Sequence, residues 1–214
     1  MLTIGCLISS FAASAPAAVF NVDAGGVIAD ATATPTTTPF TFTVTDNFTV
    51  TAISLQFSAS HSFVGDLKVV LQSPLGTQRE LFSNLGRIGG SENTWFQDIV
   101  FTDSASTRIG AVVDTNPYVG NYKAQQVTGD LSGFIGENSL GVWTLFVTDT
   151  APPDSGYLYR VGDNSNTLPS AQTRFGIAAG TALTVVPEPS EYATVFGLVA
   201  LGVVIIHRRI KKTA

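Results

Sequence analysis

The chain has 214 residues, of which 44% are hydrophobic and only 13% are charged, and this length suits one domain of ordinary size with short appendages. The hydrophobic share excludes a charge-driven, intrinsically disordered chain. The 16 Asp and Glu residues outnumber the 11 Lys and Arg residues, which argues against a nucleic-acid binder because no basic surface is available for phosphates. The 20 Gly and 10 Pro residues favour strands and turns over helices.

Residues 1–18 predict a signal peptide. A short apolar run over 2–11 is followed by small residues that suit cleavage after Ala17 or Ala18. No Lys or Arg precedes Lys68, so either the true start lies upstream or the signal is weak. The single Cys, Cys6, cannot form an intramolecular disulfide, and it lies too early in the chain for a lipoprotein acceptor.

Residues 192–207 predict a transmembrane helix and residues 208–214 a basic cytoplasmic tail. The uncharged segment 193–206 would span about 21 Å as a helix, which is shorter than the ~30 Å hydrocarbon core. Tyr192 at one end and snorkelling Arg208 at the other extend its reach. The alternative is a buried helix of the soluble domain, but packing explains poorly the four cations that follow. The positive-inside rule places the acidic middle of the chain outside the cytoplasm.

The apolar run is the middle part of a three-part pattern. A Pro-Glu-Pro motif precedes it in a linker over 183–191, and two arginines follow it. The motif residues are Pro187, Glu188, Pro189, Arg208 and Arg209. In this order the parts resemble the PEP-CTERM sorting signal of Gram-negative, exopolysaccharide-producing bacteria. The resemblance implies an inner-membrane single-pass intermediate that an exosortase, a membrane-embedded protease-transpeptidase, processes before delivery to the cell surface or matrix. Physical properties alone predict a C-terminal anchor with a proline-stiffened spacer.

Alternation of apolar and polar residues predicts strands in the middle of the chain. It runs over 40–45, 48–51 and 53–57, with a one-residue phase change at Ala52 that indicates a bulge or a crossing between sheets. Two later strands present inward faces made by Leu67, Val69 and Leu71 and by Trp143, Leu145 and Val147.

Helical periodicity with caps is absent from the sequence between Val22 and Val185. The sequence therefore predicts an all-β fold, an antiparallel β-sandwich or jelly roll. We place it at residues 38–182, after a Thr/Ala/Pro-rich lead-in over 19–37.

Residues 60–77 read SHSFVGDLKVVLQSPLGT, and further motifs follow in order at 101–105, 117–122, 131–134 and 141–149. This series resembles the P domain (P/Homo B) that follows the catalytic domain of proprotein convertases and many bacterial subtilisin-like proteases. The resemblance covers roughly residues 38–158 and implies a galactose-binding-like jelly roll. It implies no protease activity, because the catalytic domain is not part of the match.

The sequence departs from this pattern after Leu158. A closing strand with Trp is expected at once, but residues 160–171 form a polar insertion. We place the closing strand at 173–179 instead.

No catalytic residues are predicted. A Ser nucleophile needs a His base, and the chain offers only His61 and His207, with no Ser in a Gly-x-Ser-x-Gly turn. A triad of His61, Asp66 and a Ser can be drawn, but we interpret His61 as a loop residue that fixes the Gly65–Asp66 turn. His61, Gly65 and Trp143 are accordingly interpreted as structural residues.

Calcium is the cofactor that the sequence leaves open. Ca²⁺ takes about six to eight oxygen ligands, mostly from carboxylates and loop carbonyls. The candidate ligands are carboxylates at expected strand ends or in loops: Asp66, Asp103, Asp149 and Asp154. The P-domain resemblance implies calcium binding through such residues, and the alternative is that they cap turns.

Three functions are compatible with the sequence. The favoured one is a non-enzymatic surface or matrix protein whose partners include the exosortase and an exopolysaccharide. The second is an accessory module of a secreted subtilisin-like protease made as a separate chain. The third is a permanent single-pass membrane protein that is not sorted.

Overall fold

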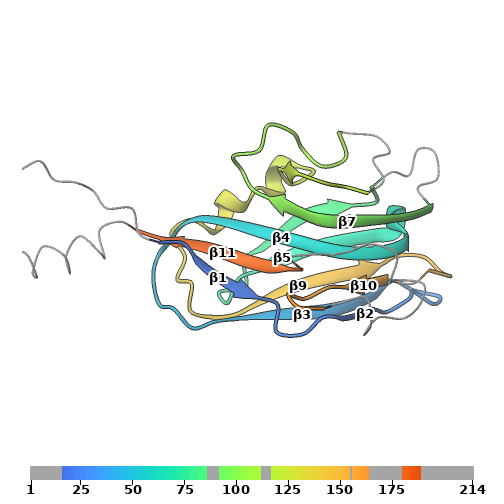
Figure 1. Cartoon of the computed structure of the whole chain (residues 1–214), viewed down its shortest axis with the longest axis horizontal. Coiled ribbons are helices and arrows are strands. Elements are labelled where there is room, and N and C mark those ends of the chain that lie inside the picture. The colour runs from blue at the N-terminus through green and yellow to red at the C-terminus, as the bar shows by residue number, and fades with distance from the viewer. Residues whose placement is uncertain (1–15, 86–91, 112–116, 155, 164–179, 189–214) are drawn as a thin grey trace, which may run out of the picture.

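The computed structural model describes residues 16–85, 92–111, 117–154, 156–163 and 180–188. These residues form two packed β-sheets, and the predicted β-sandwich is confirmed (Figure 1). Sheet A contains β1 (Ala18–Asn21), β2 (Gly26–Ile28), β4 (Val50–Phe63), β7 (Glu92–Phe101), β8 (Asn121–Tyr122), β10 (Gly156–Leu158) and β11 (Ala182–Pro187). Sheet B contains β3 (Thr36–Val44), β5 (Leu67–Gln72), β6 (Gln78–Ser83) and β9 (Gly141–Asp149).

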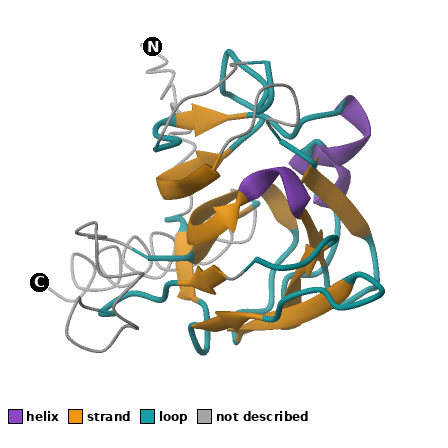
Figure 2. Cartoon of the chain, turned by 90° about the vertical axis from the view of Figure 1, so that its right-hand side faces the viewer, coloured by secondary structure: helices purple, strands orange, loops and turns teal. Residues whose placement is uncertain are grey.

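The strand pairs are antiparallel except for β7 with β8, which are parallel. The helical segments among the described residues are single 3₁₀ turns that lie beside the strands (Figure 2), namely η1 (Val64–Asp66), η2 (Val127–Gly129) and η3 (Leu131–Phe134). This agrees with the absence of helical periodicity in the sequence.

Strand β9 shows why alternation forms a sandwich here. Its residues Trp143, Leu145 and Val147 are fully buried, while the residues between them are partly exposed. Because side chains of a strand point alternately to the two faces of a sheet, this face of β9 meets sheet A. The indole Nε1 of Trp143 donates a hydrogen bond to the carbonyl oxygen of Ser139 at 2.9 Å.

Strand β4 contains the phase change that the sequence places at Ala52. The strand is continuous from Val50 to Phe63. Val186 pairs with Ala52 and Pro187 pairs with Val50, so Thr51 is an extra residue opposite β11. The prediction of a bulge is confirmed, because the extra residue returns the apolar side chains to the same face.

Aromatic side chains from both sheets meet in the core. The ring of Phe57 in β4 lies 6.0 Å from that of Phe82 in β6, and 5.1 Å from that of Phe96 in β7. Both contacts have edge-on geometry, which aromatic pairs favour. The two sheets are therefore joined by direct ring contacts.

Segments that the sequence analysis placed outside the sandwich belong to sheet A. β1 begins at Ala18, the last residue of the predicted signal peptide, and continues into the expected lead-in, which also contains β2; β11 extends into the expected linker at 183–191. These strands have three to six residues, and β1 and β2 each pair with a single strand, β11 and β10, which lie far away in the sequence. The expected closing strand at 173–179 lies outside the described residues.

The two ends of the sandwich differ in what they carry. β1 begins and β11 ends at the same end, because Ala18 pairs with Val185 in an antiparallel register (Figure 1). β9 finishes at the opposite end, where Asp149 pairs with Leu67 at the start of β5. No helix of the described residues is long and apolar enough to cross a membrane; the predicted segment 192–207 lies outside them.

Candidate functional site

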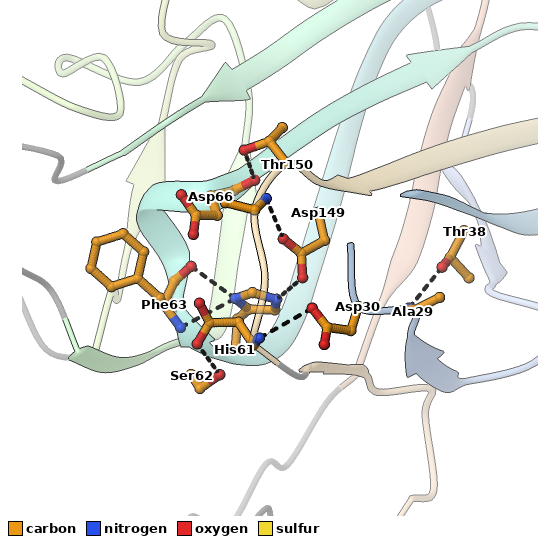
Figure 3. A network of polar contacts seen from close by, with 11 residues as sticks. Ala29, Asp30, Thr38, His61, Ser62, Phe63, Asp66, Asp149 and Thr150 are labelled. Carbon is orange, nitrogen blue, oxygen red and sulfur yellow. Dashed lines mark hydrogen bonds and ion pairs between the residues drawn. The ribbon is translucent and has the colours of Figure 1, made fainter. Parts of the chain in front are cut away.

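Polar side chains gather where β4 ends, at the end of the sandwich away from the exit of β11 (Figure 3). His61 is the second residue of the SHSFVGD motif at 60–66 and is 3% exposed. Its Nε2 atom lies 3.2 Å from Oδ2 of Asp149, the last residue of β9. This contact joins sheet A to sheet B.

The other ring nitrogen of His61 faces the backbone of Phe63. Nδ1 lies 2.8 Å from the carbonyl oxygen and 3.2 Å from the amide nitrogen of that residue. Because a carboxylate can only accept, Nε2 carries a proton, and Nδ1 then accepts from the amide or, when protonated, donates to the carbonyl. Both ring nitrogens are engaged within the fold in either state.

Asp149 and Asp66 fix the chain beside this ring. Oδ1 of Asp149 accepts from the backbone amide of Ala151 at 3.2 Å. The carbonyl oxygen of Asp66 accepts from the amide and the hydroxyl of Thr150, at 2.9 and 2.8 Å. The turn of η1 is thereby tied to the loop that leaves β9 (Figure 3).

Asp154 lies in the same region. Oδ1 of Asp154 accepts from the hydroxyl of Ser62 at 2.6 Å, and its amide donates to Oδ1 of Asp30 at 3.1 Å. Asp30 follows β2 and is not among the residues predicted from the sequence, because the residues next to it in the chain are typical of an ordinary loop. Its position depends on the pairing of β2 with β10, which sequence alone did not predict.

Two glycines allow this close packing. A Cβ atom on Gly156 would lie 2.5 Å from Cδ2 of His61 and 2.7 Å from the carbonyl oxygen of Ser60. A Cβ atom on Gly65 would lie 2.6 Å from Cε1 of Phe63. Gly65 of the Gly-Asp-Leu motif is thus placed against the ring of Phe63, the residue whose backbone contacts His61.

The four candidate calcium ligands do not form one site. Asp66, Asp149 and Asp154 lie at the His61 end, but Asp103 follows β7 and accepts from the amides of Leu131 and Ser132 at the start of η3. Both carboxylate oxygens of Asp149 already accept hydrogen bonds. Among the described residues no group of three or more His, Cys, Asp and Glu side chains is arranged to hold a metal ion. The four residues as a set therefore do not fit a calcium ion.

Arg108 and Asp130 form an ion pair that the sequence did not indicate. The guanidinium donates to both carboxylate oxygens, at 2.6 and 2.9 Å, and to the carbonyl oxygen of Ala124 at 2.8 Å. These hydrogen bonds hold the pKa of Asp130 below its ordinary value. The two residues are 22 positions apart, so no local pattern connects them.

The predicted sorting motif begins inside the fold. Pro187 is the last residue of β11 and is buried, and Glu188 is partly exposed. The hydroxyl of Thr51 donates to the carbonyl oxygens of Val186 and Pro187, at 2.9 and 3.1 Å. Pro189, Arg208 and Arg209 lie outside the described residues.

Comparison with known proteins identifies the fold's family. Residues 50–162 match the sequence model of the proprotein convertase P-domain. The chain belongs to the proprotein convertase P-domain family. The match runs from the start of β4 to just beyond β10, so it contains His61, Asp66, Asp149 and Asp154, while Asp30 and the strands β1, β2, β3 and β11 lie outside it.

Solved structures give further similarities. A serine protease of Aeromonas sobria in complex with its chaperone is 21% identical over 82% of this chain and 27% of that chain, with a TM-score of 0.40. The structure of the serine protease of Aeromonas sobria alone is 20% identical over the same shares, with a TM-score of 0.39. This chain thus spans about a quarter of the length of these similar chains. A search of curated proteins gives no match.

Proposed function

We propose that this P-domain protein is a non-enzymatic module that is exported to the cell surface or extracellular matrix, with its C-terminal tail acting as a PEP-CTERM sorting signal. The observation that carries the proposal is the position of the two ends of the domain. β1 begins and β11 ends at one end of the sandwich, so the predicted signal peptide and the predicted anchor both join the domain there. The opposite end is left to face outward.

The polar network at that outward end supports a structural rather than a catalytic role. The side chains of His61 and Asp149 are both 0% exposed, and each nitrogen of the ring is engaged within the fold. A general base must reach the proton of a reacting group within hydrogen-bond distance. A buried ring with both nitrogens engaged is better suited to joining two sheets.

The tail supports the proposed sorting by its order of parts. The motif starts at Pro187, the last residue of β11, and the uncharged run 193–206 and Arg208–Arg209 come after it. In the proposed route, an exosortase processes the chain at this junction after export. The domain is then released to the surface or matrix, where an exopolysaccharide is the proposed partner.

Mass spectrometry of the mature protein tests this proposal. The full-length gene is expressed in a host with an exosortase, and the protein is recovered from membrane and surface fractions. We expect a mature chain that starts near Ala18 and ends near Pro187–Pro189. A chain that retains residues 193–214 in the membrane at steady state would instead support a permanent single-pass protein. A matched control is Glu188→Gln, which alters the motif but leaves β11 intact.

The second candidate is an accessory module of a subtilisin-like protease. The observation that favours it is membership of the proprotein convertase P-domain family. Affinity purification of the exported protein discriminates the two: a serine protease recovered in stoichiometric amount favours the accessory role, and its absence favours the surface role.

A further inference from the structure

Four exposed apolar side chains gather at the end of the sandwich from which β11 leaves. Leu75, Ile135, Leu140 and Val142 are 66%, 53%, 48% and 51% exposed. Each belongs to a turn or to the first residues of a strand, and we call this set the apolar end. Exposed apolar groups that cluster on a small domain mark an interaction surface.

A close approach within the fold brings together the segments that carry three of these side chains, Leu75, Leu140 and Val142. A Cβ atom on Gly141 would lie 2.9 Å from Cβ of Pro74. The turn that carries Leu75 therefore packs against the start of β9, where Leu140 and Val142 flank that glycine.

The same surface reaches the exit of β11. The amide of Gly136, next to Ile135, donates to the carbonyl oxygen of Val50 at 2.9 Å. Val50 pairs with Pro187, the last residue of β11. The apolar end and the point at which the chain leaves the domain are consequently at the same end of the molecule.

We propose that, before the tail is removed, the apolar end docks into the headgroup region of the lipid bilayer, an inference that rests on the proposed membrane anchoring of the unprocessed chain by residues 193–206. Four residues, 189–192, separate Glu188 from that segment. Fully extended, four residues span at most about 14 Å. The headgroup layer on each side of the hydrocarbon core is roughly 5–8 Å thick, so the tether is too short to hold the domain far from the lipid.

The charges near the apolar end determine which lipid it fits. Asp46 and Glu137 lie in the adjoining loops, where the Ser139 hydroxyl donates to the Asp46 carbonyl oxygen and the Val50 amide donates to that of Glu137. A cation, Arg79, lies at the same end, where its guanidinium donates to the carbonyl oxygens of Thr128 and Gly133. Charges of both signs give little net attraction to anionic headgroups. Contact is therefore made by inserting apolar side chains into a zwitterionic surface, with little dependence on salt. The His61 end then points away from the membrane.

Environment-sensitive labels on the full chain test this docking. In a Cys6→Ser background, single variants Leu75→Cys, Leu140→Cys and Val27→Cys are labelled with a polarity-sensitive dye and reconstituted into phosphatidylcholine vesicles. Val27 is the matched control because it is an apolar residue with 58% exposure in β2, near the His61 end. Vesicle flotation reports anchoring separately from the dye.

We expect the dye emission at positions 75 and 140 to shift to shorter wavelength in vesicles and to be quenched by lipids that carry a quencher at the headgroup. The dye at position 27 should show neither effect. If the chain floats with the vesicles but positions 75 and 140 remain water-exposed, the docking proposal is overturned while the anchoring stands. A shift at 75 and 140 that depends on protein concentration and not on the lipid quencher overturns it in favour of self-association. If the chain does not float, the anchoring itself fails and the docking fails with it.

Discussion

The imidazole of His61 and the carboxylate of Asp149 are in contact at 3.2 Å, and both side chains are completely buried. His61 lies in β4 of sheet A, and Asp149 is the last residue of β9 in sheet B. The pair is thus a polar connection between the two sheets. Taking charged groups out of water is costly unless each is fully hydrogen-bonded, and the further contacts to Phe63 and Ala151 meet this requirement.

Substitution of His61 by Ala is expected to lower the free energy of unfolding by about 3–5 kcal/mol, because it leaves a buried carboxylate without its partner. The measurement is urea denaturation of the purified protein. Lys68→Ala is the control, since Lys68 pairs with Glu80 at 3.0 Å but both side chains are more than 40% exposed, and such a pair contributes about 0–1 kcal/mol. Equal losses for the two variants would contradict the role given to His61.

Replacement of Gly156 by Ala should destabilise the fold by about 1–3 kcal/mol, because the added methyl group overpacks the space beside His61. Thermal unfolding monitored by circular dichroism provides the test. Gly26→Ala serves as the control in the paired strand β2, where the nearest atom to an added Cβ is Cε1 of Phe40 at an ordinary 3.6 Å. If Gly156→Ala is as stable as Gly26→Ala, the side chains around His61 can move to accommodate the methyl group, and the predicted overpacking is wrong.

Strands with strict alternation could be predicted from the sequence, and β9 is the clearest case. Trp143, Leu145 and Val147 were assigned to the core and are fully buried. The bulge near Ala52 was also readable, because a change of phase without a turn needs one extra residue. The local pattern of apolar and polar residues is sufficient to predict a strand wherever that strand buries one of its two faces.

Other features depend on partners that are far away in the chain. β1 and β11 are separated by more than 160 residues and stabilise each other only by pairing. Among the candidate site residues, Asp149 could be recognised as the end of a strand but not as the partner of His61, which was drawn with Asp66 from sequence proximity. The ion pair of Arg108 with Asp130 has no sequence signal for the same reason.

The ion pair of Arg108 with Asp130 predicts a dependence of stability on pH. The pKa of Asp130 is below its ordinary value of 3.8, chiefly through the hydrogen bonds from Arg108. A carboxyl group with a lowered folded-state pKa stabilises the fold above its unfolded-state pKa, and this stability is lost as the pH falls below that value. Asp130→Asn should therefore have a lower Tm than the parent protein at pH 6, and the difference should shrink towards pH 3. Melting curves across this range are the measurement, and a difference that is constant with pH would contradict the assignment.

The positions of the four candidate carboxylates make the prediction of the calcium hypothesis more specific. Asp103 accepts from the amides of Leu131 and Ser132 and does not lie at the His61 end, so an ion at that end would depend on the other three candidates, Asp66, Asp149 and Asp154, together with loop carbonyls. In that case EDTA lowers the Tm, and added Ca²⁺ restores it by linkage of binding to folding. Asp154→Asn should abolish the response to EDTA, whereas Asp103→Asn should lower the Tm equally with and without EDTA. A Tm of the parent protein that is the same in EDTA and in millimolar Ca²⁺ removes calcium from the description of this domain.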